Sequence, residues 1–245
     1  DKSSTLGKAK TMKRVVLLDL DDTLLDFGKA EKRAMCRTLT EWHLPTDDAT
    51  LALYSRINDA YWKRFERGEI DRREVLVGRF RDFFAALGVR DTDAEAVQNR
   101  YETLLAEGHW FVPGAEELLP ALAPHYDLYL ASNGTEKVQM GRLTSAGILP
   151  YFRGLFLSER IGAAKPSAAF FDAVFAAIGE ERRRGAVMVG DRLTSDIRGG
   201  IDAGLVTVWF NPRGEAKDPA VAPDKIITSL GELPDFLGSL PSLNA

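Results

Sequence analysis

Residues 15–23 read Val-Val-Leu-Leu-Asp-Leu-Asp-Asp-Thr. The run from Val15 to Leu20 is apolar except for Asp19, and so short an apolar run is typical of a buried strand in a parallel sheet. Asp19 and Asp21 then fall at the carboxyl end of that strand, where open α/β sheets bind their ligands. Because two neighbouring buried acids repel each other and lose their hydration, they need a positive partner. The stretch therefore predicts an α/β fold with an acidic, cation-binding site after the first strand.

Beyond residue 110, short apolar stretches alternate with helical patterns. We expect strands over 126–132, 154–158, 186–190, 205–210 and 225–228, and core helices over 114–122, 136–146, 168–178 and 195–203. Strands that alternate with helices are joined by right-handed crossovers and pair in parallel. The pattern predicts an α/β core built on a doubly wound parallel sheet.

Residues 24–110 interrupt this alternation. They contain amphipathic helical stretches over 30–42, 49–67, 71–87 and 93–108, and no strand pattern. An insertion directly after the first strand would lie above the acidic site as a cap. We therefore expect three parts, namely a flexible tail over 1–11, a catalytic core over 12–23 and 112–245, and a helical cap over 24–111.

Composition argues against several classes of partner. The chain has 245 residues and a net charge of −4, so no electrostatic argument favours nucleic acid or an acidic membrane. No apolar run approaches the roughly 20 residues of a membrane-spanning helix, and we expect no secretory signal. The single cysteine, Cys36, fits a reducing compartment. We expect a cytoplasmic protein without a nucleic-acid or membrane partner, and the oligomeric state stays open.

Three further polar motifs follow later strands or open a helix. Ser132-Asn133-Gly134-Thr135 combines a hydroxyl, a flexible glycine and the start of a helix, which together suit an anion. Lys165 precedes Pro166, which we expect to be the first residue of a helix, and offers a compact positive charge. Asp191 and Asp196 supply a second acidic pair of hard oxygen ligands that suit Mg²⁺.

These motifs match the needs of phosphoryl transfer through an aspartyl-phosphate. That reaction uses a carboxylate nucleophile, an acid/base, a divalent metal, and a cation and hydrogen-bond donors at the phosphate oxygens. We expect Asp19 to attack phosphorus and Asp21 to protonate the leaving oxygen and then deprotonate water. Ser132, Asn133 and Lys165 are the expected phosphate-binding residues, and Lys165 would also keep Asp19 ionised.

The four motifs in this order resemble those of the haloacid dehalogenase superfamily. The matching residues are Asp19-Leu20-Asp21-Asp22-Thr23, Ser132-Asn133, Lys165-Pro166, and Gly190-Asp191 with Asp196. The resemblance implies a Rossmann-like core with an inserted α-helical cap of the C1 type. It also implies Mg²⁺ held by Asp19, the backbone carbonyl of Asp21 and Asp191, with Asp196 supporting through water or Lys165.

The cap is similar to a narrower branch, the house-cleaning pyrimidine 5'-nucleotidases. The segments that carry this likeness are 24–27, 62–70, 79–80, 107–109 and 209–212. It implies a small phosphorylated metabolite as partner, most specifically a nucleoside 5'-monophosphate. A nucleoside needs an apolar or aromatic wall with a few polar groups, for which Phe27, Trp62, Phe65, Arg79 and Trp110 are available. Phe27 and Arg79 are the expected substrate contacts.

Other activities of the same superfamily stay open. Dehalogenation is disfavoured because a halide leaving group needs no proton, whereas Asp21 supplies one. Phosphonate hydrolysis would use a cap lysine, for which Lys29, Lys32 and Lys63 are available. An N-acylneuraminate-9-phosphatase, another sugar-phosphate phosphatase or mutase, and a non-enzymatic module that binds metal and phosphate are the remaining alternatives.

Overall fold

The computed structural model describes residues 12–243, so the tail expected over 1–11 lies outside the described residues. Six parallel strands form one sheet in the order β3-β2-β1-β4-β5-β6. The strands are β1 (Val15–Leu18), β2 (Asp127–Ser132), β3 (Gly154–Leu157), β4 (Val187–Gly190), β5 (Val206–Phe210) and β6 (Lys225–Ile227). The predicted doubly wound parallel sheet is confirmed, and each later strand begins and ends within one residue of its predicted bounds.

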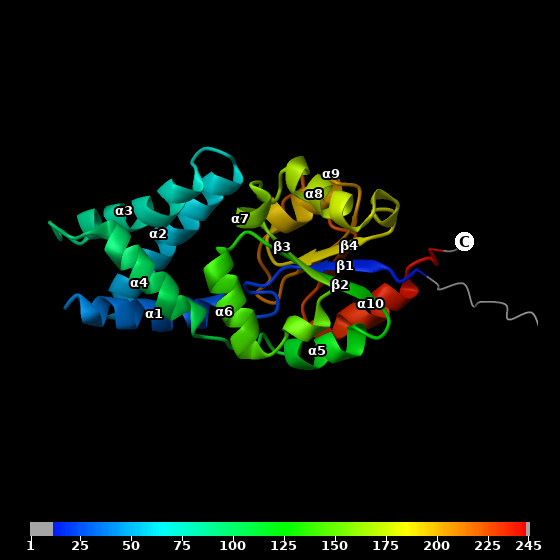
Figure 1. Ribbon diagram of the computed structural model, residues 1–245, viewed down its shortest axis with the longest axis horizontal. Helices are drawn as coiled ribbons and strands as arrows, with labels where there is room; N and C mark the ends of the chain where they lie inside the picture. The colour runs from blue at the N-terminus through cyan, green and yellow to red at the C-terminus, as the bar shows by residue number, and fades with distance from the viewer. Residues whose placement is uncertain (1–11, 244–245) are drawn as a thin grey trace, which may run out of the picture.

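Helices cover both faces of the sheet (Figure 1). The core helices are α5 (Ala115–Leu122), α6 (Glu136–Ala146), α7 (Ser158–Ile161), α8 (Ala168–Ile178), α9 (Arg198–Asp202) and α10 (Leu233–Ser239). Successive strand residues point to opposite faces. In β1, Val16 and Leu18 pack with α5 and α10, whereas Val15 and Leu17 pack with the phenylalanines of α8. The strand is therefore buried on both sides, which explains its unbroken apolar sequence.

The order of the strands places a switch point between β1 and β4. From β1 the chain winds outward through β2 and β3, and then returns to β4 and winds outward the other way. A crevice opens at the carboxyl ends of the two strands where the winding reverses, and α/β sheets bind ligands there. Asp19 follows β1 and Asp191 follows β4, so the topology brings together acids that are 172 positions apart.

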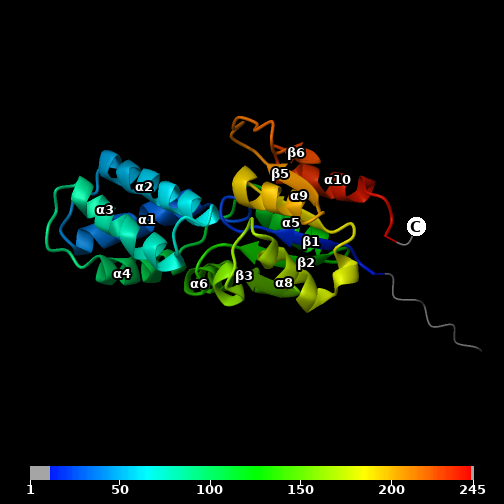
Figure 2. The same cartoon turned by 90° about the horizontal axis from the view of Figure 1, so that it is seen from above.

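The inserted residues form a second packed group beyond the carboxyl ends of the strands (Figures 1 and 2). Its helices are α1 (Phe27–Glu41), α2 (Asp48–Glu66), α3 (Arg79–Ala86) and α4 (Ala94–Ala106). Their apolar faces enclose a core rich in aromatic rings, including Tyr54, Phe80, Phe83 and Tyr101. None of the helices within residues 12–243 is long and apolar enough to cross a membrane.

Local structure departs from the sequence expectation in three regions. The stretch over 71–87 contains a π-helical turn, Glu74–Gly78, before α3, and the stretch expected as a helix over 195–203 begins with another, Leu193–Ile197. The expectation that Pro166 is the first residue of a helix is wrong. Helix α8 begins at Ala168, and the hydroxyl of Ser167 caps it by accepting from the backbone N–H of Phe170.

Gly190 is required where β4 meets the acidic loop. A Cβ added at Gly190 would lie 2.6 Å from the Cβ of Asp196, far inside van der Waals contact. We expect Gly190→Ala to lower the free energy of unfolding by about 1–3 kcal/mol, because the turn must shift to admit the methyl group. Urea unfolding measures this, and an unchanged midpoint would contradict the prediction.

The matched control is Gly238→Ala in α10, where an added Cβ meets nothing within 4 Å. That substitution should cause no loss and can raise the free energy of unfolding by up to about 1 kcal/mol, because alanine favours the helix.

Candidate active site

Asp19 lies in the crevice between β1 and β4, with both carboxylate oxygens engaged. Its backbone N–H donates to the carbonyl of Val189 at 3.0 Å, which fixes the residue to the neighbouring strand. The Nζ of Lys165 donates to Oδ1 at 2.8 Å, and the hydroxyl of Thr23 donates to Oδ2 at 3.3 Å. The carboxylate is therefore oriented from two sides before any ligand binds.

Lys165 joins three separate segments through one ammonium group. Its Nζ donates to Asp19, to Oδ1 of Asp196 at 2.6 Å and to the carbonyl of Ala131 at 2.6 Å. An ammonium has three protons, so each has an acceptor within the protein. Burial disfavours its charge, but the two carboxylates outweigh that effect and raise the pKa of Lys165. Lys165 is thus a permanent cation at the centre of the site.

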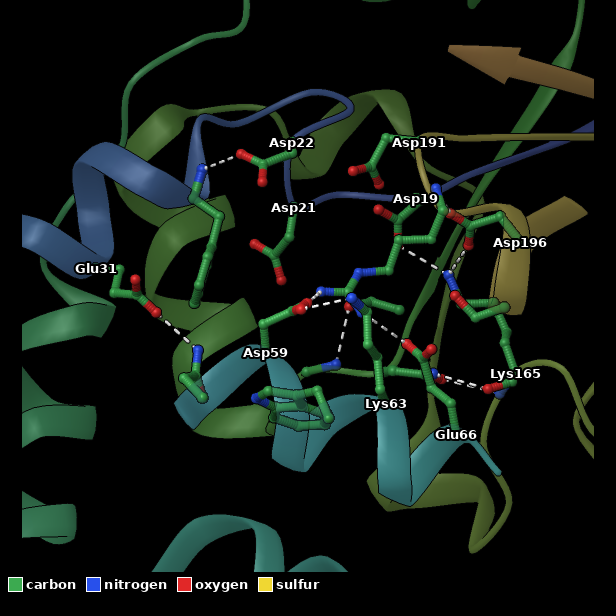
Figure 3. Close-up of a pocket in the computed structure, with 18 of the residues that line it drawn as sticks. Asp19, Asp21, Asp22, Glu31, Asp59, Lys63, Glu66, Lys165, Asp191 and Asp196 are labelled. Atoms are coloured by element: carbon green, nitrogen blue, oxygen red, sulfur yellow. Dashed lines mark hydrogen bonds and ion pairs between the residues drawn. The ribbon is translucent and has the colours of Figure 1, made fainter. Parts of the chain in front are cut away.

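A third acid, Asp191, lies beside the two that bind Lys165. Oxygens of Asp19, Asp191 and Asp196 all lie within 4.8 Å of one another (Figure 3). Burial, opposed by Lys165 and reinforced by Asp196 and Asp21, raises the pKa of Asp19 to about 7. Burial, together with Asp19 and Asp196, also raises the pKa of Asp191. The cluster therefore has an excess of negative charge that a bound cation would relieve.

The acids differ in what remains free to bind that cation. Asp196 accepts from Lys165 with one oxygen and from the backbone N–H of Arg192 with the other, at 3.1 Å. By contrast, no side chain or backbone N–H within residues 12–243 donates to the carboxylate of Asp191. Carboxylate oxygens are the ligands that Mg²⁺ prefers, and Asp191 with Asp19 offers a suitable pair. The donor set therefore fits this ion, with Asp196 holding the loop and Lys165.

Ser132 and Asn133 lie beside the cluster but have different surroundings. The hydroxyl of Ser132 accepts from Nε2 of Gln139 at 2.7 Å and from the N–H of Gly134 at 3.1 Å. Both lone pairs are used, so its proton remains available to an anion in the cavity. The side chain of Asn133 instead bonds both backbone groups of Lys165, at 2.9 Å each, and so fixes the position of that lysine.

Asp21 is held by two residues that the sequence reasoning missed. Arg142, fully buried, forms an ion pair with Oδ1, and Gln139 donates to Oδ2 at 2.8 Å. Both come from α6, whose buried face also includes Val138 and Leu143. A glutamine and an arginine three residues apart within an apolar face were the available signal, because such a face normally excludes them.

A cavity of about 520 Å³ extends from the acidic cluster toward the inserted helices. The two expected substrate contacts, Phe27 and Arg79, both line it. Of the other side chains available for a nucleoside wall, Trp62 lines it, whereas Phe65 and Trp110 do not. The guanidinium of Arg79 is buried and donates to side-chain oxygens of Asn58 and Gln98.

Two arginines connect the inserted residues to the core. Arg192, next to Asp191, forms ion pairs with Asp59 at 3.0 Å and with Glu66 at 3.3 Å, both on α2. Arg72 donates to the hydroxyl of Ser158 at 2.5 Å and to the carbonyl of Asn133 at 3.3 Å. The loops that carry the site residues therefore contact the inserted helices directly.

Comparison with known proteins gives a consistent result. Residues 13–204 match the haloacid dehalogenase-like hydrolase family. The pyrimidine 5'-nucleotidase PynA of Streptococcus pneumoniae is 36% identical over 91% of this chain and 94% of its own length. The pyrimidine 5'-nucleotidase YjjG of Escherichia coli is 30% identical over 91% of this chain and 96% of its own. The crystal structure of the haloacid dehalogenase (HAD) hydrolase YfnB from Bacillus subtilis bound to magnesium matches this chain with a TM-score of 0.85 and 35% sequence identity. The match covers 93% of this chain and 99% of the YfnB chain. Likeness over almost the whole of each protein shows that the chain belongs to the haloacid dehalogenase-like hydrolase family.

Proposed function

We propose that this hydrolase is a Mg²⁺-dependent phosphatase that hydrolyses a nucleoside 5'-monophosphate through an aspartyl-phosphate on Asp19. One observation carries the proposal, namely that Asp19 and Asp191 converge at the switch point with Lys165 bound to Asp19. Asp191 lacks a donor of its own among the described residues, as expected of a metal ligand.

The roles of the residues follow from their surroundings. An oxygen of Asp19, oriented by Lys165 and Thr23, forms a bond to phosphorus while the bond to the substrate oxygen breaks. Asp21 gives that oxygen its proton and then removes a proton from the water that cleaves the aspartyl-phosphate. The hydroxyl of Ser132 donates a hydrogen bond to a phosphate oxygen. Asp19 and Asp191 would hold Mg²⁺, which when bound would offset the negative charge of the acids and of the phosphate.

The shape of the cavity and the relatives both support a nucleotide. Ligand pockets for small molecules are typically of about 300–1,000 Å³, and this one, at about 520 Å³, leaves room beyond the phosphate. Phe27 and Trp62 supply aromatic surface for a base. PynA and YjjG, both named as pyrimidine 5'-nucleotidases, align with this chain over nine-tenths of its length.

We also propose that residues 24–111 act as a cap that closes over the substrate. The chain enters and leaves the insertion through paired segments, because Asp26 N–H donates to the carbonyl of Trp110 at 2.8 Å and Val112 N–H to that of Leu24 at 2.9 Å. Two adjacent connections of this kind allow the helical group to move as a unit while the core stays fixed.

The nucleophile is tested by Asp19→Asn. Turnover of nucleoside 5'-monophosphates, sugar phosphates, N-acylneuraminate 9-phosphate and p-nitrophenyl phosphate should require Mg²⁺, stop with chelator and be undetectable in the variant. The reason is that uncatalysed phosphate-monoester hydrolysis is extremely slow, since enzymes accelerate it by up to about 10²¹-fold. Asp172→Asn, at an exposed aspartate of α8, is the matched control and should keep full activity. Activity in Asp19→Asn, or activity that ignores chelator, would refute the proposal.

Metal binding should depend on pH with a defined sign. A carboxylate binds Mg²⁺ only when deprotonated, and the pKa of Asp19 is about 7 in the metal-free protein. Mg²⁺ should therefore raise the melting temperature more above pH 7 than below it.

Without Mg²⁺, the contribution of Asp19 to the stability of the folded protein should fall as the pH rises. The folded state holds the proton of Asp19 more tightly than the unfolded chain, so this group's contribution to stability is lost as pH rises from about 4 to about 7. Thermal melts with and without Mg²⁺ measure both trends, and Asp19→Asn should weaken them. A Mg²⁺ effect on melting that grows toward acid pH would be inconsistent with this assignment.

The cap should select substrates by size. Closure over the cavity admits a nucleotide but excludes a phosphate carried on a folded protein. We expect kcat/KM for a phosphoprotein to fall far below that for nucleotides, as measured by phosphate release. Comparable rates for the two would rule out a closing cap.

A further inference from the structure

A chain of four buried polar side chains crosses the centre of the inserted helices, with one member from each of α1 to α4. Asn58 donates to Oε2 of Glu31 at 2.7 Å, and Arg79 donates to Oδ1 of Asn58 at 2.5 Å and to Oε1 of Gln98 at 2.6 Å. Each of these residues is 6% exposed or less. Burying so many polar groups is costly unless each is used, so the chain needs an explanation.

The members of this chain differ in their relation to the cavity. Glu31, Asn58 and Arg79 line it, whereas Gln98 does not. Figure 3 shows Glu31 at the far end from Asp191, Asp19 and Asp196. A substrate whose phosphate meets Asp19 would therefore extend its other end toward Glu31.

Glu31 has an unusual environment for a buried acid. No lysine, arginine or histidine within residues 12–243 forms an ion pair with it, and its hydrogen-bond donors are the neutral side chains of Asn58 and Ser55. A carboxylate offers about four acceptor positions, so capacity remains on the side that faces the cavity. Ser55 also lines the cavity, and its hydroxyl oxygen keeps its lone pairs to accept a hydrogen bond from a ligand.

We propose that Glu31 accepts a hydrogen bond from a ring N–H on the base of the nucleotide, which makes it a specificity-determining residue for bases with an imide edge, such as uracil and thymine. This inference rests on the proposed nucleotidase function. Asn58, fixed by Arg79, is a positioning residue that holds the carboxylate toward the cavity. If Glu31 served only to hold α1 and α2 together, its side chain would not need to line the cavity.

The test compares uridine 5'-monophosphate with its N3-methyl analogue, which lacks the ring N–H. The readout is the ratio of their kcat/KM values, which cancels any general loss of activity. In the unaltered protein the ratio should be about 10- to 100-fold in favour of the unmethylated nucleotide, because a hydrogen bond to a charged acceptor is lost. In Glu31→Leu the ratio should approach one, and in Glu31→Gln, which keeps a neutral acceptor, it should fall in between.

Thr38→Val is the matched control. Thr38 is buried on the same helix as Glu31, donates within that helix to the carbonyl of Ala34 at 2.8 Å and does not line the cavity. This variant should keep the full ratio. Melting temperatures establish that each variant is folded, and Glu31→Gln, which preserves shape, carries the test if Glu31→Leu does not fold.

The outcomes separate the two proposals. If the unaltered protein does not hydrolyse nucleotides, the proposed function fails and this inference fails with it. If it does, a ratio near one in the unaltered protein, or an equal ratio in the Glu31 variants, would overturn the role of Glu31 while leaving the nucleotidase function intact.

Discussion

The contact between the Lys165 ammonium and its three acceptors is the constraint on which the rest of the site depends. Asp19 follows β1, Ala131 lies on β2 and Asp196 belongs to the loop after β4, and one buried Nζ bonds all three. Removing it would leave two buried carboxylates without their shared cation, which is far more costly than breaking an exposed pair. Asn133 in turn fixes the backbone of Lys165, so the loop after β2 and Asp19 are positioned by one network.

Sequence reasoning predicted the parts of this site that depend on order along the chain. The acids at Asp19 and Asp191 follow buried strands, and parallel strands in doubly wound order bring their carboxyl ends together whatever the loops contain. The bounds of the later strands were accurate to within one residue, because a short apolar run between polar turns has few alternative positions. The first strand ends at Leu18, before the end of its apolar run at Leu20.

The sequence pattern does not predict contacts between side chains that are far apart along the chain. Arg142 and Gln139 meet Asp21 from 121 and 118 positions away, and nothing in the local pattern of α6 states which acid they face. Likewise, Arg79 was identified as a possible substrate contact, but its engagement by Asn58 and Gln98 depends on how α2, α3 and α4 pack. The start of α8 was misjudged because a proline can lie before a helix as well as open it, and Ser167 is the better cap.

The paired connections at Leu24–Val112 and Asp26–Trp110 have a consequence for how such enzymes diversify. Because the insertion starts and finishes at neighbouring points, an insertion of a different length could join the core there without interrupting a strand of the sheet. If the insertion selects the substrate, as proposed above, it can diverge while the strands that carry Asp19 and Asp191 are inherited unchanged. A change of substrate would then involve residues 24–111, roughly one contiguous third of the polypeptide.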